Sequence, residues 1–148
     1  MPALGQDLLW GNAARLGSEV AKFTYDHIHL RSPNPEATAA FHEPMFGAEV
    51  IRTLQQAKSR IDLKIGGANI FVAEVLPDAK INPPPQTRDQ GLDHFGLSVK
   101  EIDAVVAELK AKGAQYTMEP TTTRRGVPIA FLRGTEGVSI ELLERSAH

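Results

Sequence analysis

Two similar stretches, Tyr25-Asp26-His27-Ile28-His29-Leu30 and Leu92-Asp93-His94-Phe95-Gly96-Leu97, lie 67 residues apart in the chain. At the same spacing, Glu74 in Val72-Ala73-Glu74-Val75-Leu76 matches Glu141 in Ser139-Ile140-Glu141-Leu142-Leu143. Each half of the chain therefore places a histidine 47 residues before a glutamate. Because self-similarity at a fixed spacing is the signature of repeated structural units, we expect two copies of one unit.

The order of predicted secondary structure repeats as well. In the first half, a strand over Phe23–Arg31 is followed by a helix that begins at Asn34-Pro35-Glu36 and ends near Phe46-Gly47, with Pro44 expected to kink or stop its last turn. Three strands are expected after it, near Ala48–Gln55, Arg60–Ile65 and Asn69–Leu76. The second half is predicted to hold a strand over Leu92–Val99, a helix over Lys100–Lys112, and strands near Ala114–Met118, Pro128–Leu132 and Val138–Leu143. The pattern is β-α-β-β-β twice, which predicts an α+β fold.

These boundaries predict a single domain over residues 23–144, made of modules 23–76 and 92–144. A linker over residues 77–91 joins the modules, and its run of prolines predicts an extended segment on the surface. Residues 1–22 lie outside the repeat and are interpreted as an N-terminal extension.

Composition excludes several classes of function. The 148 residues include 16 Lys and Arg against 18 Asp and Glu, a formal net charge of -2, so no basic surface for nucleic acid or an anionic membrane is expected. Cysteine is absent, which rules out disulfides and thiolate ligands. No apolar run approaches the ~20 residues of a membrane-spanning helix, and no signal peptide pattern follows Met1. We therefore expect a soluble, cytoplasmic protein whose partner is a small molecule.

Strand alternation predicts the face that each candidate residue occupies. Next to Glu141, the apolar residues Val138, Ile140 and Leu142 form one face, so Glu141 belongs to the other. In the first half, Phe71, Ala73 and Val75 are expected to face the core, which would turn Glu74 away from it. The histidines His27 and His94 are expected on the faces that the helices leave open. If the two sheets curve toward each other, one cavity receives His27, Glu74, His94 and Glu141.

Two imidazoles and two carboxylates suit a divalent metal ion such as Zn, Ni, Co, Mn or Fe. Such an ion can polarise a carbonyl and stabilise an enolate while a carboxylate moves protons. His29 shares the predicted face of His27, which makes it a candidate hydrogen-bond donor or general base. By contrast, we expect His42 and His148 to be solvated, and Arg124, Arg125 and Arg133 to form a solvated cluster.

The sequence resembles the vicinal oxygen chelate superfamily, which includes glyoxalase I, bleomycin-resistance proteins and extradiol dioxygenases. The resemblance covers residues 23–144 and rests on Asp26-His27-Ile28-His29-Leu30, Phe46-Gly47-Ala48, Asp93-His94-Phe95-Gly96-Leu97-Ser98-Val99 and Gly137-Val138-Ser139-Ile140-Glu141-Leu142. It implies a single glyoxalase-like domain whose two βαβββ modules form a curved mixed sheet around a metal-binding cavity. The ligand positions of the family correspond to His27, Glu74, His94 and Glu141.

A set of two histidines and two glutamates is similar to that of glyoxalase I. This likeness implies a metal-dependent lyase or isomerase that acts through an enolate-type intermediate on a small oxygenated substrate, with Glu141 moving the proton and Glu74 as its partner. One alternative is an extradiol, ring-cleaving dioxygenase, which uses two histidines and one glutamate with Fe or Mn and leaves Glu74 without a necessary role. A second alternative is a metal-free binding protein similar to the bleomycin-resistance proteins. A homodimer is expected, because the curved sheets can be completed across an interface.

Overall fold

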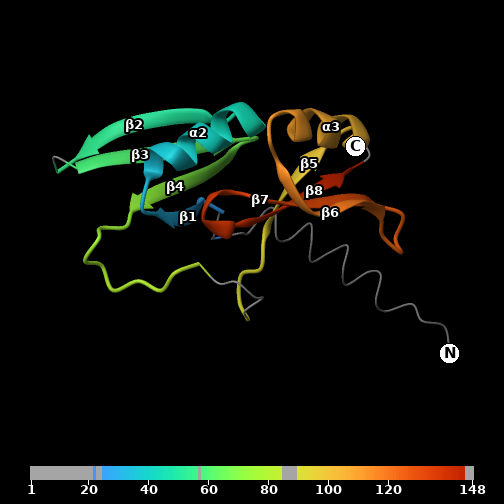
Figure 1. The fold of residues 1–148 in the computed structure, drawn as a ribbon. Coiled ribbons are helices and arrows are strands. Elements are labelled where there is room, and N and C mark those ends of the chain that lie inside the picture. The colour runs from blue at the N-terminus through green and yellow to red at the C-terminus, as the bar shows by residue number, and fades with distance from the viewer. Residues whose placement is uncertain (1–21, 23–24, 57, 85–89, 146–148) are drawn as a thin grey trace.

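The computed structural model describes residues 22, 25–56, 58–84 and 90–145, arranged as two modules that lie side by side (Figure 1). Residues 1–21 lie outside the described residues, so the predicted N-terminal extension is not described here beyond Lys22. Part of the predicted linker, residues 85–89, lies outside them too, and the rest of it forms neither helix nor strand. Within the described part of the chain, no helix is long and apolar enough to cross a membrane.

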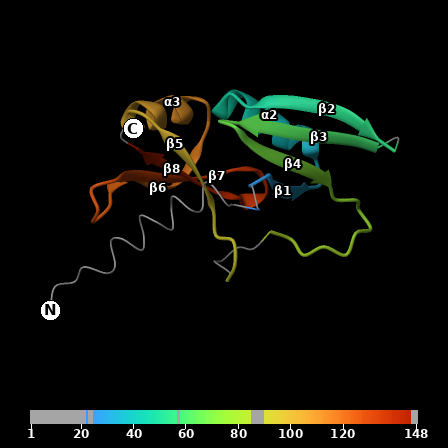
Figure 2. The ribbon, with the colours of Figure 1, turned by 180° about the vertical axis from the view of Figure 1, so that it is seen from behind.

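Module 1 is a four-stranded mixed sheet with one helix against it (Figures 1 and 2). Its elements are β1 (His27–Ser32), α2 (Pro35–Phe46), β2 (Glu49–Gln55), β3 (Lys58–Ile65) and β4 (Ala68–Glu74). The strands lie in the order β1-β4-β3-β2, with β1 parallel to β4 and the other neighbours antiparallel.

Module 2 repeats this arrangement. Its elements are β5 (Phe95–Val99), α3 (Ile102–Ala111), β6 (Gln115–Thr122), β7 (Pro128–Arg133), the short 3-10 turn η1 (Thr135–Gly137) and β8 (Ser139–Glu144). The strands lie in the order β5-β8-β7-β6, again with the first pair parallel. The predicted α+β fold of two βαβββ modules is confirmed. Each module holds its own four-stranded sheet, and no described strand of one sheet pairs with a strand of the other.

The ends of α2 follow from its sequence. Asn34 caps the helix by accepting a hydrogen bond from Ala37 N at 3.1 Å, and Pro35 occupies the first turn as expected. The helix continues past Pro44 to Phe46, so Pro44 does not stop it. Gly47 ends it instead: its φ of 66° is a left-handed conformation that favours glycine, and its N–H donates to Glu43 O at 2.9 Å.

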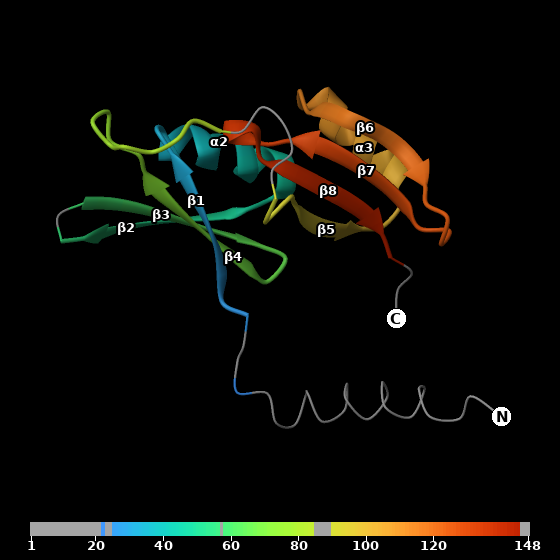
Figure 3. The same cartoon turned by 90° about the horizontal axis from the view of Figure 1, so that it is seen from below.

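A single helix covers one face of each sheet. Under α2 lie the buried residues Ile61, Leu63, Ile70 and Val72, and under α3 lie Ala130, Leu132, Ile140 and Leu142. Figure 3 shows the sheets from the opposite side, with both helices behind them. We call these opposite sides the open faces. By strand alternation, the open face of module 1 carries His27, His29, Arg60, Asp62, Phe71 and Ala73, and that of module 2 carries Gly96, Ile129, Phe131, Glu141 and Leu143.

The predicted orientation of β4 is wrong by one residue. Ile70 and Val72 are buried in the core, with exposed fractions of 1% and 4%, whereas Phe71 and Ala73 are only partly buried and belong to the open face. Since neighbouring residues of a strand point to opposite sides, Glu74 follows the side of Ile70 and Val72. The predicted faces of β1 and β8 agree with the structure.

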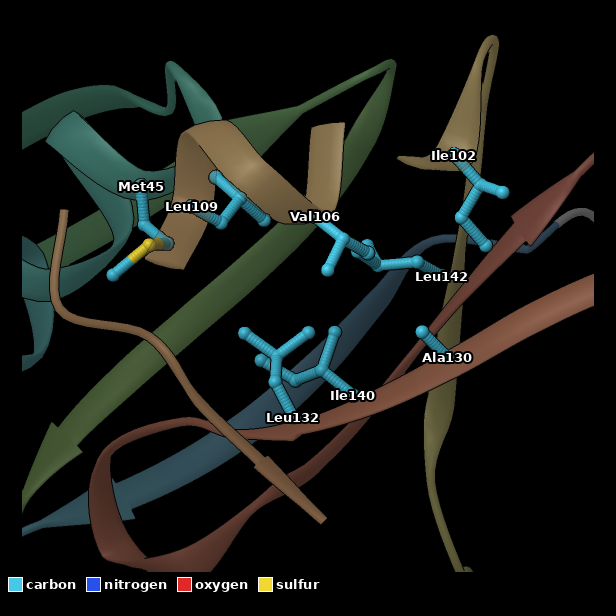
Figure 4. Close-up of a cluster of buried hydrophobic side chains, with 8 residues drawn as sticks. All are labelled: Met45, Ile102, Val106, Leu109, Ala130, Leu132, Ile140 and Leu142. Atoms are coloured by element: carbon cyan, nitrogen blue, oxygen red, sulfur yellow. The ribbon is translucent and has the colours of Figure 1, made fainter. Parts of the chain in front are cut away.

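The two modules are joined through α2. Its residue Met45 belongs to the buried cluster of module 2, beside Val106 and Leu109 (Figure 4). A chain of hydroxyl groups also crosses the junction: Thr135 Oγ1 donates to Thr38 Oγ1 at 3.3 Å, and Thr38 Oγ1 donates to Ser32 Oγ at 2.9 Å. The side chains of Thr38 and Ser32 are buried, and the bond from Thr135 connects this pair to module 2.

Candidate metal centre

The closest approach between two predicted ligands is in module 2. His94, just before β5, and Glu141, on β8, meet with 3.2 Å between His94 Nε2 and Glu141 Oε2. Their side chains are one-third and less than one-fifth exposed, at 33% and 18%. Gly96 lies directly opposite Glu141 in the sheet, and a Cβ atom there would approach Glu141 Oε2 to 3.4 Å and Leu143 Cδ2 to 3.3 Å. The absence of a side chain at Gly96 therefore leaves room for the Glu141 carboxylate.

Both predicted histidine ligands are held by the aspartate that precedes them. His94 Nδ1 donates to Asp93 Oδ2 at 2.8 Å, and His27 Nδ1 donates to Asp26 Oδ2 at 2.6 Å. An ionised carboxylate only accepts hydrogen bonds, so it places the ring proton on Nδ1 and leaves the Nε2 lone pair available. This arrangement is typical of metal-ligating histidines, whose second nitrogen is fixed by a carboxylate or carbonyl. The sequence contained the signal in its two Asp-His pairs, but neither aspartate was predicted to have a role.

The contact between His94 and Glu141 fits a cation. With one proton on Nδ1, His94 pairs with the Glu141 carboxylate either through a second proton on Nε2, as an ion pair, or through a metal ion that takes the place of that proton. Zinc lies about 2.1 Å from such nitrogen and oxygen ligands, so two adjacent ligands are separated by about 3 Å. The observed 3.2 Å is close to this separation. The residues present therefore fit a divalent ion.

The module 1 half of the predicted centre is built differently. The ring of His27 stacks on Phe71, with 4.2 Å between centroids, and His29 lies edge-on to His27 at 6.1 Å. Burial lowers the pKa of His29 below 6.5, and coulombic interactions with Arg31, His27 and Arg60 lower it further, while Asp62 opposes them. His29 is consequently neutral at pH 7 and able to accept a proton.

Glu74 is not the counterpart of Glu141 in the register of the sheets. Glu141 lies opposite Gly96, which is two residues after His94. The residue opposite His29, two residues after His27, is Phe71, whereas Glu74 lies opposite Ser32 at the far end of β4. The structural repeat thus aligns Phe71 with Glu141, and the sequence match of Glu74 with Glu141 does not hold in three dimensions.

The structure brings together one predicted pair, His94 and Glu141, and keeps the other candidates apart from it. Across the described ranges 25–56, 58–84 and 90–145, no three His, Asp or Glu side chains are arranged to hold a metal ion. His27 and Glu74 belong to the other module. A complete set of ligands therefore requires the open faces of the two modules to meet, within one chain or between two chains.

Two further predictions concerned residues outside this centre. His42 is not solvated: it is 1% exposed, and its Nδ1 donates to Thr38 O at 2.8 Å within α2. Burial lowers its pKa below 6.5, and its Nε2 has no hydrogen-bond partner among the described residues. Arg124, Arg125 and Arg133 are exposed as expected, and Arg133 donates to Gly137 O at 2.8 Å.

A cavity of about 710 Å³ adjoins the module 1 half of the centre. Its lining includes His29 and Phe71, which both contact His27, together with Ser59, Arg60 and Glu74. The volume is within the usual range for small-molecule sites, roughly 300–1,000 Å³.

Two βαβββ modules with imidazole and carboxylate groups on their open faces define a glyoxalase-like fold. The chain belongs to the Glyoxalase/Bleomycin resistance protein/Dioxygenase superfamily, whose sequence model matches residues 24–142. This membership confirms the resemblance found in the sequence.

Known relatives carry different activities in their names. The chain is 24% identical over 122 residues to a lactoylglutathione lyase of Arabidopsis thaliana, a match that covers 80% of this chain and 43% of the relative. It is 23% identical over 147 residues to the mitochondrial methylmalonyl-CoA epimerase of Dictyostelium discoideum, covering 91% of this chain and 88% of the relative. The chain thus spans less than half the length of the plant lyase.

Solved structures agree on the fold. A glyoxalase family protein from Enterococcus faecalis superposes with a TM-score of 0.65 at 25% identity, covering 83% of this chain and 98% of that one. The superfamily and the arrangement of the modules are thereby established.

Proposed function

We propose that this protein is a metal-dependent, glyoxalase-like lyase or isomerase that removes a proton next to a carbonyl group of a small oxygenated substrate. The observation that carries the proposal is the 3.2 Å approach of His94 Nε2 to Glu141 Oε2, with the His94 Nδ1 proton bonded to Asp93. Relatives named as a lyase and an epimerase support this class of reaction.

The proposed ligands are His27, His94 and Glu141. Both histidines present an Nε2 atom fixed by a neighbouring aspartate, and Glu141 supplies a carboxylate oxygen. Glu74, part of the set of four expected from the sequence, is left out because Phe71 takes its place in the register. A divalent ion held by these residues would act as a Lewis acid toward the substrate carbonyl.

His29 is proposed as the base, since it is neutral at pH 7 and lies on the same face as His27. An imidazole nitrogen of His29 accepts the proton from the substrate carbon, and the protonated ring returns it to the same or to a neighbouring carbon. The Glu141 carboxylate would be the second proton carrier. In this scheme His29 has the role that the sequence assigned to Glu74.

We propose that a second copy of the chain completes the site, because His27 and the His94–Glu141 pair are not gathered within the described part of one chain. The open face of module 1 would then meet the open face of module 2 of its partner. Co-expression of His27→Ala and Glu141→Gln chains tests this, because each mixed dimer would contain one site with all ligands. With random pairing, such a mixture would bind about one quarter of the metal bound by the wild type.

The enzyme proposal itself is tested by elemental analysis of protein purified without chelators, and of the His94→Ala variant. About one equivalent of a divalent ion in the wild type, lost in the variant, supports it. Lyase or isomerase activity is then sought as exchange of a substrate carbon-bound proton with deuterated water, followed by NMR over a panel of 2-oxo and 2-hydroxy acids. Protein that takes up no ion, even after incubation with each candidate metal, would instead be a small-molecule binding protein.

A ring-cleaving dioxygenase is the second candidate, and one observation favours it. Phe71 at the position equivalent to Glu141 leaves two histidines and one carboxylate, a set typical of non-haem iron oxygenases. Oxygen consumption in the presence of catechols, measured on protein incubated with Fe²⁺ and with Mn²⁺, separates this activity from proton exchange.

A further inference from the structure

The cavity on the open face of module 1 extends beyond the proposed ligands. His27, the ligand of this module, does not line it, but His29 and Phe71 connect the two, since both contact His27 and both line the cavity. The rest of the wall includes Gln56, Ser59 and Arg60. A substrate bound at His27 would therefore have room to extend toward these polar side chains.

Arg60 is the arginine of this wall, and its contacts include Phe71 and Asp62. Its guanidinium carbon lies 4.3 Å from the centre of the Phe71 ring, and its Nε donates to Asp62 Oδ1 at 2.8 Å. The side chains of Arg60 and Asp62 are 30% and 21% exposed, so the pair is partly shielded from water. A guanidinium held in this way loses little conformational freedom when it binds a ligand.

Phe71 lies between Arg60 and the proposed metal ligand. The phenyl ring of Phe71 stacks with the imidazole of His27. The guanidinium of Arg60 also lies over this phenyl ring. The distance from His27 to Arg60 is therefore set by one aromatic side chain. This spacing suits a molecule whose reacting oxygens and anionic group are a few bonds apart.

The equivalent position of module 2 has no charge. Arg60 precedes Ile61, which pairs with Val72, and Ile129 precedes Ala130, which pairs with Leu142. Because Val72 and Leu142 are equivalent strand positions, Ile129 is the counterpart of Arg60. Among the differences between the two open faces, module 1 carries Phe71 and Arg60 where module 2 carries Glu141 and Ile129.

We propose that Arg60 is a specificity-determining residue that binds an anionic group, a carboxylate or a phosphate, at the end of the substrate remote from the metal. Guanidinium groups bind both anions through paired hydrogen bonds, and Ser59 and Gln56 can add neutral donors. This assignment names the substrate class of the proposed enzyme and in that sense rests on the proposed function.

The test is binding of two probe anions, inorganic phosphate and succinate, to the full chain as purified and after removal of metal with a chelator. Binding is measured by NMR titration of backbone amides, with those of Ser59 and Arg60 expected to shift. Arg60→Met should weaken binding about tenfold or more, as expected for a lost charged hydrogen-bond pair. Arg60→Lys keeps the charge, so its anion affinity should lie between those of the wild type and Arg60→Met. This variant also provides a result if Arg60→Met does not fold.

Arg52→Met is the matched control. Arg52 is another strand arginine paired with a carboxylate, Glu36 of α2, on the helix-covered side of module 1. The Arg52→Met variant should bind both anions as the wild type does. Preference for phosphate would indicate a phosphorylated substrate, and preference for succinate a carboxylic acid. Equal binding by wild type and Arg60→Met would overturn the proposal.

The outcome is separable from that of the proposed function. If the protein takes up no metal but still binds anions through Arg60, the subsite proposal stands and the proposal of a metal-dependent enzyme is rejected. Full metal uptake without any effect of Arg60→Met on anion binding would reject the subsite alone.

Discussion

Phe71 and Glu141 occupy equivalent positions in the two modules. Each lies in the strand beside its module's histidine, opposite the residue two positions after that histidine, His29 in one case and Gly96 in the other. The chain therefore offers an aromatic ring where a symmetric duplication would offer a second carboxylate. Because of this difference, the proposed metal site has the three ligands His27, His94 and Glu141 in place of a symmetric set of four.

Glu74 and Glu141 are expected to respond differently to the same substitution. Glu141→Gln should abolish tight metal binding, because it removes the carboxylate that faces His94 Nε2. Glu74→Gln should retain full metal stoichiometry, because Glu74 lies opposite Ser32 and away from the histidine. Elemental analysis of both variants provides the comparison, and loss of metal in Glu74→Gln would restore the set of four ligands expected from the sequence.

Asp93 and Asp26 should act as positioning residues for the two imidazoles. Replacing either with asparagine weakens the charged hydrogen bond to His Nδ1 and should lower metal affinity about 10–100-fold. Asp78→Asn, an exposed change in the segment after β4, is the control and should have no effect. Competition with a chromophoric chelator measures the affinities. Unchanged affinity in both aspartate variants would show that the pairs are incidental.

Gly96 should be required for the position of Glu141 more than for folding. A valine side chain at this position would meet Glu141 Oε2 and Leu143, which lie 3.4 and 3.3 Å from the site of a Cβ atom. We expect Gly96→Val to lower metal affinity about tenfold or more while the protein remains folded, since valine suits a strand. Ser98→Val, on the same strand, is the matched control. Circular dichroism and metal titration of both variants separate the two effects.

Stability should fall in mild acid because of His42. The unfolded chain takes up a proton on this residue below about pH 6.5, whereas the folded protein, with a lowered pKa, takes it up only at lower pH. The free energy of unfolding should therefore decrease as the pH falls below 6.5, by at most about 1.4 kcal/mol per pH unit.

His42→Phe should remove this acid dependence, because the ring between Phe41 and Phe46 then has nothing to protonate. At pH 8 its stability should lie within about 1.5 kcal/mol of the wild type, as for other swaps of similar volume. Urea unfolding at pH 5, 6, 7 and 8 provides the data. An identical slope in both proteins would assign the acid sensitivity to other groups.

The sequence was sufficient to predict the duplicated βαβββ order, because the alternation in β1 and the helical period of Ile102, Val105, Val106 and Leu109 are local signals. It failed for β4, where Ile70–Ala73 is a continuous apolar run that has no alternation to indicate its buried face. Only the pairing of Ile70 with Leu63 and of Val72 with Ile61 settles the orientation. A one-residue error then reversed the predicted side of Glu74.

The missed features of the site depend on distant parts of the chain. His42 is buried because α2 lies between the two modules, which its own neighbours in sequence do not reveal. The start of α3 is capped by Glu144 Oε2, which accepts from Ile102 N at 2.7 Å across 42 residues of sequence. Likewise, residues 67 apart match at His27 and His94, but the equivalent Phe71 and Glu141 are 70 apart, so a single spacing could not align both.

The position of Met45 in the core of module 2 has a consequence for how the protein unfolds. A duplicated fold can in principle melt in two steps, one for each copy. Here helix α2 of the first copy supplies part of the second copy's interior, and Phe95 and Leu97 of the second copy pack against the buried cluster of the first. The two copies have become interdependent, and we expect heat or denaturant to unfold them together in one cooperative transition.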